Sequence, residues 1–176
     1  MRRSRQSSSQ FGAPWGRGIK IVTWSVIVLI SGVAIILPLA VPRKDLWVAV
    51  LIPGSVLLIL GITALFCVRG YTVRQRELWI HRSFWQTRMP LKDLRRAYAD
   101  AKAMHKCIRS CGNGGFMGVT GWFYNKKLGN FRAFITDPAR SVVLEFAKRR
   151  VVVSPDDPRA FVRALGFNPE AQRSVE

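Results

Sequence analysis

Two long, uncharged apolar runs lie close together near the start of this sequence, at residues 21–41 and 46–68. A helix needs roughly 20 apolar residues to cross the hydrocarbon core of a bilayer, so each run is long enough to span it. Helices are required there because lipid cannot satisfy exposed backbone N–H and C=O groups. Only residues 42–45 separate the runs. The sequence therefore predicts a two-helix transmembrane hairpin, with antiparallel helices over 19–41 and 46–68.

Basic residues flank this predicted hairpin much more heavily than they occupy its turn. Five precede the first helix and five closely follow the second, whereas the turn holds only Arg43 and Lys44. By the positive-inside rule, both chain ends are expected in the cytoplasm and the 42–45 turn outside it. Residues 1–18 are basic and serine-rich, which predicts a disordered tail. A cleaved signal peptide is the alternative for the first run, but that run is too long for the apolar part of such a peptide.

Small residues recur in both predicted helices at helical spacing. Ser25 and Gly32 share one face of the first helix, and Gly54 and Gly61 share one face of the second. Folding about the turn brings them to matching depth, and small residues allow close backbone approach in lipid. The pattern indicates a packing seam, within one chain or between chains, although glycine is common in membrane helices in any case.

From residue 69 onward the composition becomes that of a water-soluble fold. Short β-branched and aromatic runs between turn signals predict strands at 71–73, 78–82, 87–91, 94–99, 130–136, 141–147 and 149–154. Residues 100–110 are ambiguous between a short helix and a loop. A final amphipathic helix starts after Ser154 or Asp157, since either is a suitable cap, and ends at Gly166. The pattern favours a curled sheet or open barrel plugged by this helix.

Several blocks of this region resemble a bacterial pleckstrin-homology-like domain of the kind that often follows membrane helices. The blocks are YTV and ELWI within 71–80, MPLKDL at 89–94, the glycine-rich stretch at 111–137 and VVVSPDDPRAFVRAL at 151–165. The resemblance covers 69–166 and implies a seven-stranded barrel-like sheet with a C-terminal capping helix, followed by a tail at 167–176. It also implies a bacterial inner (plasma) membrane protein, but no assigned activity, because fold does not settle function.

Catalytic and metal-binding chemistry finds little support in the sequence. The glycine-rich stretch matches neither common phosphate-binding pattern, and repeated glycines suit bulges in a curved sheet equally well. His105, Cys107 and Cys111 do not have a known zinc spacing. No Ser-His-Asp or Cys-His arrangement stands out, and carboxylates are few. We therefore expect no catalytic residue, no metal and no cofactor, and the chain is not expected to be an enzyme.

Positive charge is the clearest functional signal, since 28 Lys and Arg against 10 Asp and Glu give a net charge of +18. Arg109, Lys126 and Lys127 flank the glycine-rich stretch, and Arg95 and Arg96 form another cluster. A solvated face is the ordinary explanation for such runs. However, a domain held next to an anionic leaflet gains from each basic residue near it. These residues are therefore the predicted contacts with anionic lipid or with a partner membrane protein.

The leading hypothesis is thus a membrane-anchored cytoplasmic binding module. A tethered nucleic-acid-binding domain is the alternative, because aromatic residues among cations suit single-stranded nucleic acid. The aromatic residues in question are Trp79, Trp85, Trp122 and Phe123. Attachment to a membrane argues against this alternative, and the same aromatic residues are suited to filling a small core.

Overall fold

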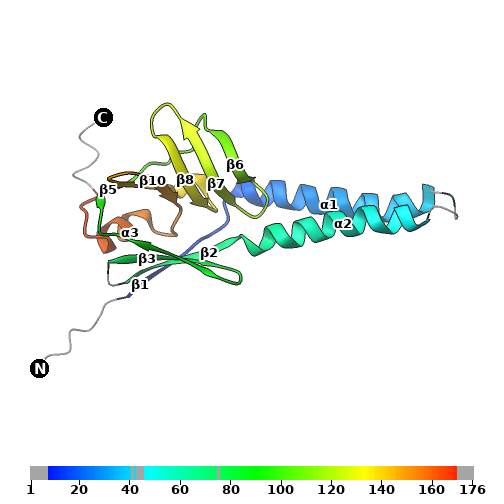
Figure 1. The fold of residues 1–176 in the computed structure, drawn as a ribbon, viewed down its shortest axis with the longest axis horizontal. Helices are drawn as coiled ribbons and strands as arrows, with labels where there is room; N and C mark the ends of the chain where they lie inside the picture. The colour runs from blue at the N-terminus through cyan, green and yellow to red at the C-terminus, as the bar shows by residue number, and fades with distance from the viewer. Residues whose placement is uncertain (1–7, 41, 43–45, 75, 170–176) are drawn as a thin grey trace, which may run out of the picture.

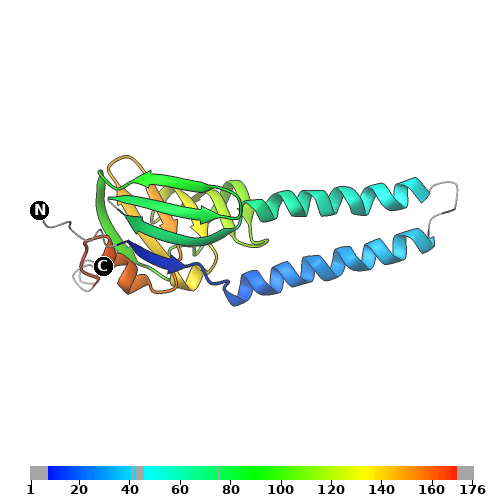
Figure 2. The same ribbon diagram turned by 90° about the horizontal axis from the view of Figure 1, so that it is seen from below.

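The computed structural model describes residues 8–40, 42, 46–74 and 76–169. Two long helices, α1 (Arg17–Ala40) and α2 (Leu46–Leu65), lie side by side and project from one end of a β-rich domain (Figure 1 and Figure 2). Most of the predicted turn at 42–45 lies outside the described residues. The chain thus has two regions of very different character, a slender pair of helices and a folded domain.

Both helices are apolar and exposed along most of their length. Among the described side chains of α1, only Ile19 and Thr23 are buried, near the start of the helix where it meets the domain. Of the helices in the described part of the chain, α1 alone is long and apolar enough to cross a membrane, because the apolar stretch counted in α2, Val50–Leu65, is shorter. The predicted membrane hairpin is therefore supported for one helix and not confirmed for two.

The glycines of the predicted seam do not pack between the helices of this chain. A Cβ atom added at Gly32, Gly54 or Gly61 would meet nothing within 4 Å. These positions therefore face open space rather than the neighbouring helix, and Ser25 is exposed as well. A seam within one chain is wrong, since spacing along two helices does not determine how each helix is rotated about its axis.

The segment before α1 belongs to the domain. Strand β1 (Ser9–Gly12) pairs antiparallel with β2 (Val68–Arg74), so that Phe11 lies opposite Tyr71. Phe11 also packs edge-on against Phe161, with ring centroids 5.1 Å apart. The prediction of a disordered tail over 1–18 is wrong from residue 9 onward, while residues 1–7 lie outside the described chain. Packing of the Phe11 side chain against the core thus orders this segment despite its polar composition.

The described strands form two sheets. Sheet A is antiparallel in the order β1-β2-β3-β4, with β3 (Glu77–Arg82) and β4 (Gln86–Pro90). Sheet B has the order β5-β9-β10-β8-β7-β6, and only its β8–β10 pair is parallel. Its strands are β5 (Leu94–Ala99), β6 (Ile108–Gly114), β7 (Val119–Asn125), β8 (Gly129–Ile135), β9 (Val142–Phe146) and β10 (Arg150–Val153).

Every strand expected from the sequence is present, at the predicted bounds for β5 and with shifted ends for the others, whereas the β6–β7 hairpin was not expected. Gly112 and Gly121 face each other across this hairpin with φ angles of 119° and 144°. A Cβ atom on either would collide with a carbonyl oxygen of the opposite strand. The glycines of this block thus allow two strands to approach closely. This is a structural role, as opposed to the phosphate-binding role considered from the sequence. Within residues 100–110, left ambiguous by the sequence between a short helix and a loop, 101–106 form turns and 108–110 belong to β6.

The main core lies between the two sheets and is closed by helix α3 (Pro158–Ala164) at the end away from α1 and α2 (Figure 1). The Asp157 carboxylate caps this helix by accepting hydrogen bonds from the backbone N–H groups of Arg159 and Ala160. Phe161 and Val162 are fully buried. The predicted mainly-β domain with a C-terminal helix is therefore confirmed, and Asp157 is the cap.

Tyr71 joins the two sheets within this core. Its hydroxyl donates to the carbonyl oxygen of Phe134 at 2.6 Å and accepts from the backbone N–H of Ser154 at 3.1 Å. Burial raises the pKa of Tyr71 to about 12. Because Tyr71 belongs to sheet A and Phe134 to sheet B, this hydroxyl fixes one sheet against the other.

A second core covers the outer face of sheet B and attaches α1 to it. Ile19 is buried there and Trp15 packs against the same cluster. The backbone N–H of Gly16 donates to the carbonyl oxygen of Thr136 at 2.8 Å. The start of α1 is therefore a structural part of the domain, and the long exposed section of the helix begins beyond it.

Candidate anion-binding surface where the helices meet the domain

Two turns of the domain contact the helices at one end, which we call the helix end (Figure 1). The Ser83 hydroxyl, in the β3–β4 turn, donates to the carbonyl oxygen of Ala64 in α2 at 3.2 Å. In the β6–β7 turn, the backbone N–H of Met117 donates to the Thr23 hydroxyl of α1 at 3.0 Å, and its carbonyl oxygen accepts from Cys67 Sγ at 3.0 Å. Both turns are therefore held at the level where the helices leave the domain.

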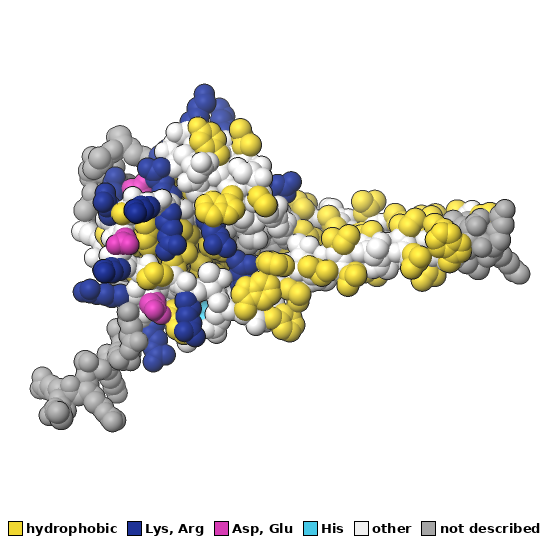
Figure 3. Space-filling model, viewed as in Figure 1, with side chains coloured by type: hydrophobic (Ala, Val, Ile, Leu, Met, Phe, Trp, Pro, Cys, Tyr) yellow, Lys and Arg dark blue, Asp and Glu magenta, His cyan; other side chains and the backbone are white. Residues whose placement is uncertain are grey.

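Exposed aromatic side chains gather at the helix end. Phe84, at the tip of the β3–β4 turn, is 79% exposed. Its neighbour Trp85 packs edge-on against Phe66, which directly follows α2, with centroids 4.9 Å apart. Figure 3 shows hydrophobic side chains gathered where the domain meets the helices. Aromatic rings at such a level are typical of a membrane–water interface.

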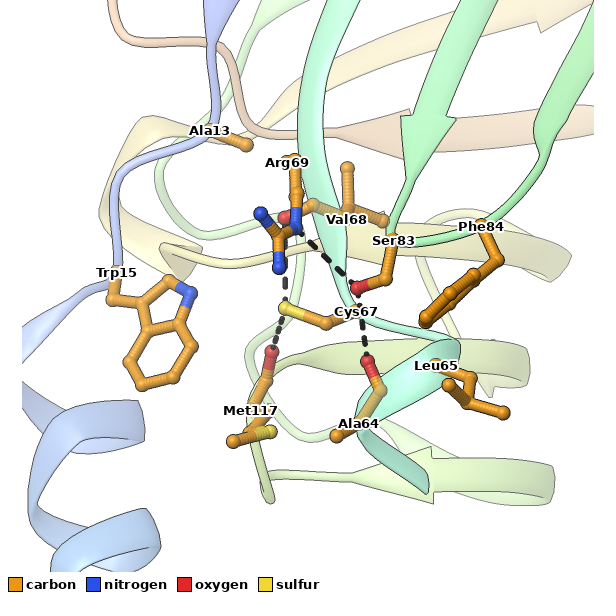
Figure 4. Close-up of a pocket in the computed structure, with 10 residues that line it drawn as sticks. All are labelled: Ala13, Trp15, Ala64, Leu65, Cys67, Val68, Arg69, Ser83, Phe84 and Met117. Carbon is orange, nitrogen blue, oxygen red and sulfur yellow. Dashed lines mark hydrogen bonds between the residues drawn. The ribbon is translucent and has the colours of Figure 1, made fainter. Parts of the chain in front are cut away.

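A cavity of ≈ 520 Å³, the junction pocket, lies between the helices and the domain. Figure 4 shows it bounded by Trp15 on one side and by Phe84 on the other, with Cys67 and Met117 between them. Arg69 is the one basic side chain of its lining, and its Nε–H donates to the Ser83 hydroxyl at 3.4 Å. The junction pocket is thus mostly apolar, and its single cation already has a hydrogen-bond partner.

A second hollow of ≈ 330 Å³, the inter-sheet cleft, lies between the two sheets. Phe66 and Arg82 line it from one side, and Trp122, Arg132 and Phe134 line it from sheet B. The remaining lining residues come from β6 and β7 and are uncharged, so two arginines face a hollow that holds no acidic side chain. On the face of the domain seen in Figure 3, Lys and Arg cover far more of the surface than Asp and Glu.

Arg82 and Arg132 point into the cleft because of their positions in their strands. Alternate residues of a strand face the same side, and Arg82 follows Leu78 and Ile80, which are fully buried in the main core. Arg132 is two residues before the buried Phe134 on β8. Each arginine therefore occupies a core-facing position at the open side of the two-sheet packing.

The two guanidinium groups lie against aromatic rings rather than against carboxylates. Their Cζ atoms are 5.1 Å (Arg82) and 4.8 Å (Arg132) from the centroid of the Phe134 ring. Arg82 Nε is buried without a hydrogen-bond partner, and neither arginine forms an ion pair with any described acidic residue. Burial, and secondly the charge of Arg132, lower the pKa of Arg82. The cleft thus holds uncompensated positive charge.

The basic residues singled out by sequence lie elsewhere and are not brought together. Lys126 and Lys127 form the turn after β7, which we call the far-end turn because β7 starts beside the helix end and runs away from it. Arg95 and Arg96 lie on β5, one edge of sheet B, and Arg109 lies on β6, the opposite edge. Lys127 Nζ forms an ion pair with Asp100 at 3.1 Å.

The residues considered for metal binding are also separated. Cys107 is half-buried beside Asn125, with 3.3 Å between Sγ and Nδ2, whereas Cys111 is exposed on β6. His81 Nε2 is 2.8 Å from the Thr72 hydroxyl on sheet A. Among the described residues, no three His, Cys, Asp or Glu side chains are grouped as a metal site requires.

Sequence reasoning missed Arg82 and Arg132 as a pair, although a signal for the first was present. In the predicted strand at 78–82, the apolar alternation of Leu78 and Ile80 ends on Arg82. A charged residue at a core-facing position is uncommon without a partner, so it indicates an opening in the core. No comparable signal marks Arg132, because only the packing of the sheets brings it to the same cleft.

Of the comparisons with known proteins, the one with family models agrees with this architecture. No curated protein and no solved structure matches the chain. A family model described as bacterial PH domain matches residues 69–167, which is more than half of the chain and nearly all of the region that follows α2. The match covers both arginines of the cleft and the capping helix α3, in agreement with the resemblance noted in the sequence. The chain belongs to the bacterial PH domain family.

Proposed function

We propose that this protein is a membrane-anchored binding module. In this proposal α1 and α2 cross a bilayer as a hairpin, and the PH domain docks on anionic lipid headgroups of the adjacent leaflet. The observation that carries the proposal is the position of Phe84 in the β3–β4 turn. Phe84 is exposed, and its neighbour Ser83 in the same turn is hydrogen-bonded to the C-terminal end of α2. PH domains are generally non-catalytic binding modules, which is consistent with this role.

The pairing of β1 with β2 supports two membrane crossings rather than one. Strand β1 precedes α1 and β2 follows α2, yet the two strands lie in the same sheet. A chain that crosses a bilayer through α1 must therefore cross back before β2. The 20-residue α2 lies in between, and its length is close to the roughly 20 residues that a span requires.

Charge at the helix end supports docking on an anionic leaflet. Arg17 and Lys20 lie in the first turns of α1, and Arg69 follows α2. Each basic residue near an anionic surface contributes about 1 kcal/mol, an effect that decays over roughly 10 Å at ordinary salt. By the positive-inside rule, the same residues favour a cytoplasmic domain.

Hydrogen exchange of the full chain in lipid nanodiscs tests this proposal. We expect slower exchange in the β3–β4 turn when phosphatidylglycerol is included than in phosphatidylcholine alone, and a smaller difference at high salt. Full-length protein is needed because residues 9–12 complete sheet A, so a fragment starting near residue 70 lacks a strand.

The far-end turn at 126–128 serves as the internal control, and its exchange is expected to be the same in both lipids. Equal exchange of the β3–β4 turn in both lipids would contradict docking. Protection of the far-end turn instead would favour Lys126 and Lys127, and protection by a single-stranded oligonucleotide in place of lipid would favour nucleic-acid binding.

A further inference from the structure

The junction pocket and the inter-sheet cleft are both lined by arginine, but only the cleft leaves its arginine side chains without polar partners. In the junction pocket, Arg69 donates to Ser83. In the inter-sheet cleft, the side chains of Arg82 and Arg132 have neither a hydrogen bond nor an ion pair with any residue that the structure describes. Arg82 Nε has lost its hydration in the fold without gaining a replacement, and neither guanidinium faces an anion, which favours an external anion.

We propose that the inter-sheet cleft binds the phosphate group of a single anionic phospholipid, held between Arg82 and Arg132. This inference rests on the proposed membrane docking and adds to it a defined site, a ligand class and two residues. Guanidinium groups suit this ligand because their planar N–H groups match phosphate oxygens and form charge-assisted hydrogen bonds. A bound phosphate also relieves the repulsion between the two cations.

The aromatic rings hold the arginines in place for such a ligand. Arg82 lies over the rings of Phe66 and Trp85, at 5.8 and 5.6 Å, and Arg132 lies 5.8 Å from the ring of Trp122. Rings against the guanidinium faces restrict their motion, so that less conformational entropy is lost when a ligand binds. The terminal N–H groups of the two guanidiniums donate to the phosphate in this proposal, whereas Arg82 Nε stays buried without a partner.

The surroundings of the cleft favour a phospholipid over a free oxyanion. Phe66 directly follows α2, so the cleft lies close to the level where the helix leaves the domain. Phe66 and Trp122 are 42% and 50% exposed and present apolar surface beside the arginines. Inorganic phosphate cannot use that surface, whereas a glycerol backbone and the first acyl carbons can. The volume of ≈ 330 Å³ suits a phosphate with its glycerol.

Native mass spectrometry of the full chain released from nanodiscs of phosphatidylcholine and phosphatidylglycerol tests the site. We expect the wild-type protein to retain one phosphatidylglycerol molecule. The double substitution Arg82→Gln and Arg132→Gln is expected to lower that retention by at least about tenfold, the effect of a change near 1.4 kcal/mol in binding. Equal retention by this variant would overturn the proposal.

A matched control removes the same amount of charge at the far-end turn. The double substitution Lys126→Gln and Lys127→Gln is expected to retain the lipid as the wild type does. Because a glutamine in the cleft could also disturb folding, the double substitution Arg82→Lys and Arg132→Lys provides a second measurement. It keeps both charges but not the planar fork, so we expect intermediate retention. Retention that follows net charge alone, regardless of position, would overturn the site.

Two further measurements separate the possible ligand sources and the two proposals. In detergent without lipid, inorganic phosphate is expected to bind far more weakly than a short-chain phosphatidylglycerol; equal binding would make the ligand a free oxyanion and overturn the lipid assignment. Hydrogen exchange of the β3–β4 turn is recorded on the same nanodiscs. If no lipid is retained while the turn is still protected by phosphatidylglycerol, the cleft proposal fails and membrane docking stands.

Discussion

The inter-sheet cleft and the far-end turn each present two basic side chains, yet their surroundings differ in kind. At the far-end turn, Lys127 is 52% exposed and paired with Asp100. In the cleft, Arg82 and Arg132 face aromatic rings and no carboxylate. The comparison teaches that a basic side chain is suited to binding an anion when folding has removed part of its hydration without supplying an anionic partner. An exposed, paired lysine has lost little, whereas a half-buried guanidinium without an anion has lost hydration.

The largest expected effect is a loss of stability when the link between the two sheets in the main core is removed. It tests whether this link maintains the geometry of the inter-sheet cleft. Tyr71→Phe removes the two hydrogen bonds that join the sheets. Because a backbone carbonyl and an N–H group are then left buried without this partner, we expect a loss of about 2 kcal/mol in unfolding free energy. Thermal unfolding in detergent micelles measures this loss. Lipid retention is expected to fall as well if sheet spacing sets the cleft.

The same substitution has a pH signature. In the unfolded chain the tyrosine loses its proton above about pH 10, whereas in the folded protein its pKa is about 12. This stabilising difference is therefore complete below pH 10 and is lost as the pH rises towards 12. We expect the wild type to lose more stability than Tyr71→Phe over this interval. Parallel pH profiles of the two proteins would contradict the assignment.

A smaller effect of opposite sign tests the cost of the unpaired charge in the cleft. Arg82→Met replaces a half-buried cation with an apolar chain at a core-facing position, so we expect unfolding free energy to rise by about 1 kcal/mol. Arg88→Met is the matched control, because Arg88 lies 4.0 Å from the ring of Trp79 and is exposed. Removal of Arg88 is not expected to stabilise the protein. Destabilisation by Arg82→Met would show that Arg82 stabilises the fold instead.

The smallest effect is expected at the far-end turn. Lys127→Met removes the ion pair with Asp100, and exposed pairs of this kind contribute about 0.2–1 kcal/mol. We expect a loss in this range that shrinks as salt is added, with lipid retention unchanged. A loss of retention equal to that of the cleft variants would remove the distinction between the two regions.

The sequence predicts those parts of the fold whose signals are local. The alternation of Leu78 and Ile80 marks a strand, and Asp157 followed by Pro158 marks the start of α3. Strand β1 escapes prediction because four residues in a polar segment form a strand only through their pairing with β2, which is distant in the sequence. The candidate site escapes for the same reason, since Arg82 and Arg132 meet only when the two sheets pack together.

The pairing of β1 with β2 also constrains the order in which the protein can mature. The N-terminal strand leaves the ribosome first, but its partner appears only after both helices have been made. Until then Phe11 has no core to enter, and afterwards β2 keeps a bare edge unless β1 reaches it. An unpaired edge invites association with other chains. This edge of sheet A is therefore covered only after both helices and β2 have been made and β1 has paired with β2.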